Sequence, residues 1–389
     1  MRVTMPTIFR NIQGNLQNLA EDLQKLNASI ASGQKYQKLS DNPVEVGALL
    51  GLYREGSQTQ QFERNLITGK SWLSLTESAL EHIEEMVRAA MALANQMASG
   101  TYNAAQRQAA AQQVQGYIEE IMQMGNTSLN GHYIFGGFRT DTPPFVTGDW
   151  EIQSPVLRLK PGSAGTATSG GTYTGSASCT FLVEIVSDGG TGVGTYRVSR
   201  DGGQTWSATS TIPAGPIALG DGAEVTLGGS WTAGDRILIP VYQEIEYQGD
   251  DHSFEIAVGS HSRLAINRLG NETVGGDQGP NDLFQILSRL KSYLEGNDVA
   301  GVGEALENLR SYETHLTSIL AGLGASLDRI SIKENLFATL KNELTQQIST
   351  RGDTDMVEAV NLLKTKETAY QAALVSATKV MGLSLMDYL

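Results

Sequence analysis

The chain has 389 residues, of which 40% are hydrophobic and 18% charged, a composition typical of folded rather than disordered proteins. Its net charge of −14 argues against a nucleic-acid-binding protein, which needs a basic face for phosphate groups, and against binding to an anionic membrane surface. One cysteine, Cys179, excludes an internal disulfide. The first residues lack the apolar core of a cleaved secretion signal, and no apolar run reaches the ~18 residues of a membrane span. We therefore expect either a cytoplasmic protein or export by a route that removes no leader.

The first predicted helix carries apolar residues at alternating steps of four and three, which is the spacing of a coiled-coil seam. The segment SGQKYQKLSDNP then ends this helix, because Pro43 lacks a backbone N–H and disfavours helical geometry at Asn42. Ser40 or Asp41 is predicted to cap the next helix, with Pro43 in its first turn. The seam consists of Ile12, Leu16, Leu19, Leu23, Leu26 and Ile30, and the hinge of Leu39, Ser40, Asp41, Asn42 and Pro43.

The second predicted helix covers residues 44–97. At ~1.5 Å per residue it would be roughly 80 Å long, which is the length of a rod element. A third helix follows the break SGTYN and is predicted to carry apolar residues as far as Leu129.

Residues 140–275 are rich in Gly, Thr and Ser and contain short β-type runs such as TFLVEIV (180–186) and DRILIPV (235–241). Turn residues separate these runs, so the sequence predicts an all-β insertion with hairpin turns. Residues 161–178 are of low complexity and are predicted to form a flexible loop or an irregular edge strand.

One motif in this insertion raises the question of an enzyme. SRDGGQTW (199–206) fits the Asp-box pattern found in sialidase-like propellers, which makes a secreted glycosidase an alternative to weigh. A propeller needs several blades, however, and the motif occurs once. We interpret it as a hairpin turn in which Asp201 accepts from loop N–H groups while Gly202 and Gly203 supply positive φ angles.

No nucleophile elbow, phosphate-binding loop, HExxH motif or paired carboxylates stand out elsewhere. The sequence therefore predicts a protein that is not an enzyme, with no catalytic residue, no cofactor and no metal site. His252 follows Asp250 and Asp251, which could hold a cation weakly, but a solvated loop is the favoured interpretation.

Helical periodicity returns near residue 281, with a short helix and then a long one over residues 299–348. The segment STRGDTD (349–355) breaks the pattern, and Asp353 is predicted to cap the last helix. The seam of that helix is Val360, Leu363, Tyr370, Leu374, Ala377 and Met381.

The two ends of the chain mirror each other, so we expect the first helix to pair with the last and the two long helices with each other. The predicted fold class is α+β and multidomain: a long antiparallel coiled-coil-like rod formed by both chain ends, with an inserted all-β domain at its tip. The predicted divisions are terminal axial-core helices (1–42 and 355–389), a helical rod domain with β-hairpin elements (43–145 and 243–354) and a β domain (146–242). The short end helices bury little surface alone and are expected to order fully only against other subunits.

Several stretches together resemble the flagellin superfamily of bacterial axial proteins. They are MRVTMPTIFRNIQGNLQNL at the start, IASGQKYQKLSDNP at the first break, LNGHYIFGGFRTDTPPF (129–145) and KETAYQAALVSATKVMGLSLMDYL (366–389). The start MRVT and the end LSLMDYL are more similar to the hook–filament junction branch than to filament flagellins, which begin with a run such as M-A-x-x-I-N-T-N. In the family the third stretch turns from the rod into the β domain, which assigns that role to Tyr133, Ile134, Phe135, Gly136 and Gly137.

The resemblance implies a structural adaptor that joins the hook-side junction to the filament outside the cell. It implies type III export, assembly through coiled-coil packing of the terminal helices, and four partners: the first hook–filament junction protein, flagellin, copies of the chain in a helical ring, and an export chaperone on the C-terminal helix. Neither nucleic acid nor membrane insertion is implied. A filament flagellin is the structural alternative, and the glycosidase is a remote one.

Overall fold

The computed structural model describes residues 5–279 and 281–386, without the side chains of residues 5, 6, 8 and 380–386. The chain divides into two compact units. The terminal unit comprises Met1–Arg64 and Lys333–Leu389, and the central unit comprises Asn65–Ile332. Two helices, α2 (Pro43–Met97) and α6 (Val299–Gly352), run through both.

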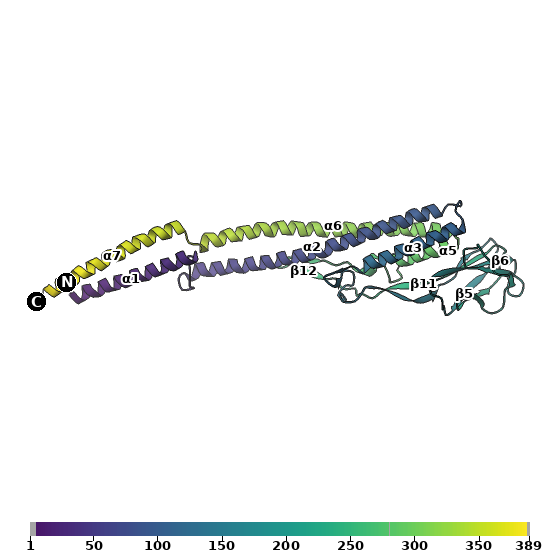
Figure 1. Ribbon diagram of the computed structural model, residues 1–389, viewed down its shortest axis with the longest axis horizontal. Coiled ribbons are helices and arrows are strands. Elements are labelled where there is room, and N and C mark those ends of the chain that lie inside the picture. The colour runs from purple at the N-terminus through teal and green to yellow at the C-terminus, as the bar shows by residue number, and fades with distance from the viewer. Residues whose placement is uncertain (1–4, 280, 387–389) are drawn as a thin grey trace. The chain divides into compact units, whose positions relative to one another are not determined.

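In the terminal unit, α1 (Met5–Ser32) packs along α7 (Met356–Met386) (Figure 1). The first part of α2 faces the last part of α6, with the rings of Phe62 and Phe337 stacked at 5.8 Å between centroids. Lys341 Nζ lies 3.1 Å from Glu63 Oε2 beside this stack. The pairing of first with last helix and of long with long helix is therefore present within this unit.

In the central unit, α2 and α6 are joined by α3 (Ala104–Gly125), the short α4 (Gly270–Thr273) and α5 (Leu283–Glu295). The third helix ends at Gly125 rather than near Leu129, because residues 128–133 form a hairpin of β1 (Ser128–Leu129) and β2 (His132–Tyr133). Asn130 and Gly131 have φ angles of 53° and 85°, as an Asn-Gly hairpin turn requires. The turn chemistry overrides the helical pattern here.

The β insertion is a pair of packed antiparallel sheets. The larger sheet has the order β3 (Phe145–Ile152), β11 (Arg236–Tyr247), β6 (Cys179–Ser187), β7 (Thr195–Ser199), β8 (Ser210–Thr211), with β4 (Val156–Arg158) also paired to β11. The smaller sheet has the order β5 (Thr166–Gly171), β10 (Ala223–Gly228), β9 (Ile217–Gly220). Inward residues of both sheets form one core, including Phe181, Val183, Ile217, Val225, Ile237 and Ile239. A third pair, β12 (Glu255–Ala257) and β13 (Arg263–Ala265), forms a separate hairpin.

Within residues 161–178, β5 is an edge strand that pairs with β10 over six residues, which is the second of the two predicted alternatives. Strand pairing uses backbone groups, so a run of Thr, Ser and Gly with little apolar character can still complete a sheet. Such a strand lacks the alternation of apolar and polar side chains by which strands are predicted from sequence.

The Asp-box motif is the hairpin turn that the sequence predicts. Asp201 Oδ1 accepts from the Thr205 N–H at 2.8 Å and from Ser199 Oγ at 2.7 Å. Gly202 and Gly203 have φ angles of 67° and 91°. The guanidinium of Arg197 lies 4.1 Å from the ring centroid of Trp206, which completes the packing of the turn.

One side of the larger sheet is covered in part by α5, which contacts β6 and β11. At the end of the helix, Glu295 Oε2 accepts from Thr180 Oγ1 at 3.0 Å. The following turn is tied to the helices by Arg107, which donates to Asn297 Oδ1 at 2.5 Å and to the carbonyl of Met97 at 3.0 Å. The β insertion is thus fixed to the helices of the central unit through several elements.

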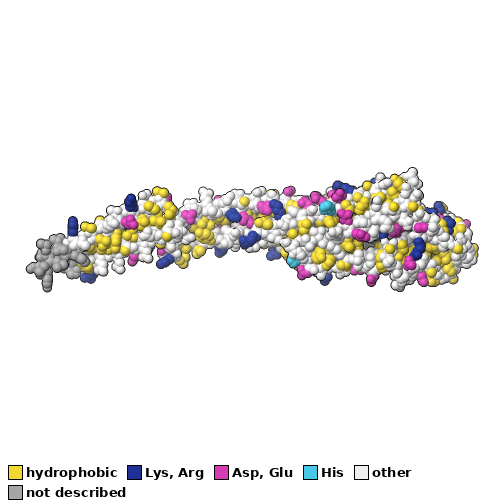
Figure 2. All heavy atoms as spheres, viewed as in Figure 1, with side chains coloured by type: hydrophobic (Ala, Val, Ile, Leu, Met, Phe, Trp, Pro, Cys, Tyr) yellow, Lys and Arg dark blue, Asp and Glu magenta, His cyan; other side chains and the backbone are white. Residues whose placement is uncertain are grey.

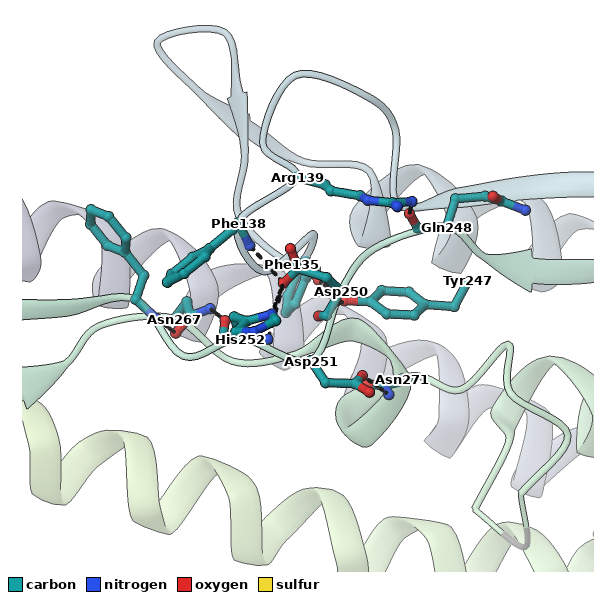
Figure 3. A network of polar contacts seen from close by, with 11 residues as sticks. Phe135, Phe138, Arg139, Tyr247, Gln248, Asp250, Asp251, His252, Asn267 and Asn271 are labelled. Atoms are coloured by element: carbon teal, nitrogen blue, oxygen red, sulfur yellow. Dashed lines mark hydrogen bonds and ion pairs between the residues drawn. The ribbon is translucent and has the colours of Figure 1, made fainter.

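The segment predicted to turn out of the helices forms a dense network around Asp250 (Figure 3). Ile134 and Phe135 are fully buried, and Tyr247 donates through its hydroxyl to the Phe135 carbonyl at 2.9 Å. The carboxylate of Asp250 accepts from the N–H groups of Phe138 and His252 at 2.9 and 3.0 Å. Burial opposes ionisation, but these N–H groups hold the pKa of Asp250 below its usual value.

Gly137→Ala is expected to destabilise the central unit by about 2–4 kcal/mol. Gly137 has φ 66°, and an added Cβ would lie 2.5 Å from the backbone oxygen of Asp250, which cannot rotate away. Urea unfolding followed by tryptophan fluorescence measures the loss, since all four tryptophans lie within residues 65–332.

Gly131→Ala is the matched control, because Gly131 has φ 85° but no atom within 4 Å of the added Cβ. Gly131→Ala should lower the free energy of unfolding by only about 1 kcal/mol. Equal losses of stability in the two variants would show that the contact of Gly137 with Asp250 is not the cause.

Candidate assembly interface

The seam predicted on the first helix faces α7. All six of its residues are only half-buried within the chain, although they are the most apolar stripe of α1: Ile12, Leu16, Leu19, Leu23, Leu26 and Ile30. A polar bridge flanks the stripe, with Lys366 Nζ 2.7 Å from Asp22 Oδ2. Two helices alone cannot enclose a seam, so its residues keep part of their surface in water.

The seam predicted on the last helix divides between two faces of α7. Leu363, Tyr370 and Ala377 are half-buried, whereas the exposed fractions of Val360 and Leu374 are 48% and 41%. At about 100° per residue, the latter two fall to one side of the stripe that faces α1. Met381 lies in the part of α7 whose side chains are outside the description.

Further apolar side chains at the start and middle of α7 extend this exposed flank. Val357 and Val375 have exposed fractions of 74% and 56%, whereas Leu362, 44% exposed, falls on the opposite side of the stripe. On the face drawn in Figure 2, hydrophobic side chains lie at the surface of these terminal helices. Contiguous exposed apolar surface is typical of interaction sites, which makes this flank a candidate interface.

The hinge LSDNP is a tight turn followed by a capped helix. Asp41 Oδ2 accepts from the N–H groups of Gln37 and Lys38, both at 2.9 Å, and these bonds lower the pKa of Asp41. Asn42 Oδ1 accepts from the Glu45 N–H at 3.2 Å, and Pro43 is the first residue of α2. The helix cap is therefore Asn42, and neither Ser40 nor Asp41. Asp41 is already committed to closing the turn behind it.

At the second break, too, the residue that caps the helix differs from the predicted one. Asp355 caps α7, with its Oδ1 accepting from the Val357 and Glu358 N–H groups at 2.9 and 3.1 Å. The prediction of Asp353 as the cap is wrong, because Asp353 forms an antiparallel bridge with Gln34.

The two breaks are joined to each other by backbone hydrogen bonds. Lys35 N–H donates to the Gly352 carbonyl at 2.7 Å, and Thr354 N–H donates to the Gly33 carbonyl at 2.8 Å. Gly352 also packs on Leu49, where a Cβ would lie 3.3 Å from Cδ2. Interruptions more than 300 residues apart thus form one joint, which we call the paired break. The glycines at 33 and 352 lie at this joint and are visible in the sequence, but the sequence does not show that they meet.

The capping assignment predicts that Asn42→Ala destabilises the terminal unit by about 1 kcal/mol. The variant leaves the N–H groups in the first turn of α2 without a side-chain acceptor. Circular dichroism during urea unfolding measures the loss of this helical unit. Ser40→Ala is the control and should change stability by less than about 0.5 kcal/mol; a larger loss from Ser40 than from Asn42 would restore the original capping prediction.

Other kinds of site find little support in the described residues. None of their helices combines the length and the apolarity needed to cross a bilayer. Within residues 5–279 and 281–386, no three His, Cys, Asp or Glu side chains gather as metal ligands would. His252 Nδ1 lies 3.5 Å from Asp250 Oδ1, and its ring stacks on Phe138 at 5.2 Å.

The fold has known counterparts. Residues 7–140 match the family described as the bacterial flagellin N-terminal helical region. A flagellar hook-associated protein from Vibrio parahaemolyticus shares the fold, with a TM-score of 0.51 at 14% identity over 80% of this chain and 100% of that one.

These matches show that the chain is similar to flagellin-like proteins in its N-terminal helical region, and that its terminal helices and inserted β domain have a counterpart of known structure. Its curated relatives are flagellar hook-associated protein 3 of Salmonella typhimurium, 25% identical over 175 residues, and of Escherichia coli, 24% identical over 146 residues. The matches cover 44% and 37% of this chain, and 55% and 46% of the relatives, so the chain spans about half the length of the curated relatives it matches. The predicted resemblance to a flagellin-like hook-associated protein 3 is confirmed. The name of both relatives is that of a flagellar hook-associated protein, in agreement with the non-enzymatic prediction.

Proposed function

We propose that the chain is a structural adaptor of the bacterial flagellum that joins the hook-side junction to the filament. The observation that carries the proposal is the seam between α1 and α7, which is apolar, paired and still half-open to solvent. The relatives named hook-associated protein 3 support the same role.

The partial exposure of this apolar seam provides a driving force for assembly. Burial of apolar surface contributes about 25 cal/mol per Å², so further copies gain free energy by covering the half-buried stripe and the exposed flank at Val357, Val360 and Leu374. The patches on α1 and α7 differ, so contacts between copies are heterologous and can generate a ring or helix. The assembly residues predicted on both helices remain part of this proposal, Met381 included.

In the proposed assembly, residues 1–42 and 355–389 pack near the fibre axis as coiled coils. Residues 43–145 and 243–354 form an antiparallel rod, and residues 146–242 form the β domain at its tip. The hinge at Leu39–Pro43 and the paired break set the angle between the axial helices and the rod. Hydrogen bonds across the paired break support this role, because they hold both chain ends at one bend.

The proposed partners are the first hook–filament junction protein, flagellin and copies of the chain itself. Export through the flagellar type III apparatus would bring it outside the cell, and a chaperone would bind the C-terminal helix beforehand. The exposed apolar flank of α7 suits such protection, since an amphipathic helix binds in an apolar groove.

Immunogold localisation on intact flagella tests the function. A junction protein gives label confined to the base of the filament, with few copies in purified filaments. Filament flagellin is the second candidate, because the matched N-terminal family is flagellin's own. Label along the whole filament would establish that alternative, and label absent from flagella would overturn both.

A further inference from the structure

A row of charged side chains crosses four strands of the β insertion. Arg236 on β11 pairs in register with Arg158 on β4 and with Glu184 on β6. Glu184 in turn pairs with Arg197 on β7. Directly paired residues point to the same face of a sheet, so the four side chains form one line, which we call the arginine row.

The row lies on the side of the sheet that α5 covers only in part. The neighbouring inward residues Val183 and Ile237 belong to the core between the sheets. The side chains of Arg236 and Arg197 are 43% and 37% exposed, so the row continues beyond the cover of the helix.

The two ends of the row differ in how their charges are used. Arg158 Nε lies 2.7 Å from Asp298 Oδ2, and its terminal nitrogens lie 3.0 and 3.1 Å from the two oxygens of Glu304. Burial alone would lower the pKa of Arg158, but these carboxylates raise it above its usual value. Arg158 therefore holds the β insertion to the α5–α6 corner. Its positive charge is fully compensated by the carboxylates of Asp298 and Glu304.

The exposed end of the row carries excess positive charge. Arg197 and Arg236 share the single carboxylate of Glu184, and the contacts of Arg236 to it are long, at 3.4 Å. Lys160 is exposed and lies against Gly234, two residues before Arg236. Three exposed or partly exposed cations thus accompany two largely buried carboxylates, those of Glu184 and Asp235, on a chain with net charge −14.

A complementary stripe lies on α2 of the same unit. Glu77, Glu81 and Glu85 recur every four residues, which places them on one face of the helix about 6 Å apart. Glu81 and Glu85 are exposed. Among the described residues, the three carboxylates of the stripe have one ion-pair contact, from Glu85 to His82 at 3.9 Å. Strands lie ~4.8 Å apart, so Arg197 and Arg236 stand roughly 10 Å from each other, close to the ~12 Å from Glu77 to Glu85.

We propose that the exposed end of the arginine row docks on the Glu77–Glu81–Glu85 stripe of a second copy of this chain. The occupant is a second copy because the stripe supplies carboxylates at a matching spacing, of which only Glu85 has an ion-pair contact, with His82. The two patches are different, so the contact is heterologous and repeats from copy to copy. This proposed contact is independent of the flagellar role and of the seam between α1 and α7.

Charge exchange on the full-length chain tests the contact. Variant A is Lys160→Glu/Arg236→Glu, which keeps Arg197 as the partner of Glu184 and as the cation over Trp206; tryptophan fluorescence checks that the variant is folded before association is measured. Variant B is Glu81→Lys/Glu85→Lys. Sedimentation velocity at about 20 mM and about 500 mM NaCl follows self-association, because exposed charge pairs weaken as salt screens them.

Each variant alone should associate roughly tenfold more weakly than the parent at low salt, because like charges then face each other. An equimolar mixture should regain parental association, since the acidic row of A meets the basic stripe of B and the parental row of B meets the parental stripe of A. Glu119→Lys/Glu120→Lys, which changes net charge as B does at exposed positions of α3, should associate as the parent does.

Parental association by either variant, or failure of the mixture to recover, would overturn the proposal. Loss in A alone would show that the row binds something other than the stripe, such as an acidic polymer, and would also overturn it. All variants retain both terminal helices, so loss of this contact with normal localisation on flagella separates it from the proposed function.

Discussion

Leu19→Glu/Leu23→Glu is expected to leave the central unit folded and to abolish incorporation of the chain into flagella. Both leucines lie in the half-buried seam of α1 against α7. Full burial of one leucine contributes about 1.5–3 kcal/mol, and much of that gain is still to be realised when other copies cover the seam. Two carboxylates there would have to be desolvated without partners, which costs more than the lost apolar contact.

Complementation of a strain that lacks the chain, read by swimming motility and immunogold labelling, measures the effect. Tryptophan fluorescence on the purified variant checks that residues 65–332 remain folded. Gln17→Glu/Gln24→Glu is the matched control, since it adds the same charge to exposed positions of the same helix. Normal filaments built by the seam variant would contradict the proposed assembly.

Long helices could be predicted from the sequence because one signal repeats many times along them. The second helix was predicted over residues 44–97 and runs from Pro43 to Met97. A stripe of apolar residues over 15 turns averages out local exceptions, and Pro43 fixes the start. The Asp-box turn was equally readable, because its glycines and its carboxylate act within eight residues.

Helix caps were harder to predict from the sequence, because neighbouring residues of similar chemistry can fill the same position. Ser40, Asp41 and Asn42 are all good N-caps, and only the backbone path decides which side chain meets the free N–H groups. Asp41 is taken by the turn at Gln37 and Lys38, which leaves Asn42 for Glu45. At the other break, the bridge of Asp353 to Gln34 removes it from capping.

Contacts between distant segments carried no signal that one sequence could show. The hydrogen bonds of the paired break join residues 33–35 to residues 352–354 through backbone atoms. The face of α7 was ambiguous for a related reason. Its apolar residues are spread widely around the helix, and the residues that meet α1 are selected by the partner rather than by spacing. The arginine row likewise exists only through strand register.

A buried ion pair gives the second large expected effect. Lys291 and Glu295 on α5 are 4% and 8% exposed, with Nζ 3.6 Å from Glu295 Oε1. Lys291 Nζ also contacts Gln115 Oε1 at 2.9 Å and the hydroxyl of Ser178. The pair therefore links α5 to α3 and to the residue that precedes β6.

Lys291→Met should destabilise the central unit by about 3–5 kcal/mol at neutral pH, because it leaves the buried carboxylate of Glu295 without its cation. Exposed Lys160→Met should change the free energy of unfolding by less than about 0.5 kcal/mol. Urea unfolding followed by tryptophan fluorescence compares the two variants directly.

The pH dependence identifies the cause of this loss. Burial already raises the pKa of Glu295, and removal of Lys291 raises it further. Above the unfolded-state pKa near 4.3, the folded variant then binds more protons than the unfolded chain, so its stability falls as pH rises. Lys291→Met/Glu295→Gln should recover much of the loss and remove the slope, since a neutral amide needs no cation. A slope that persisted in the double variant would locate the titrating group elsewhere.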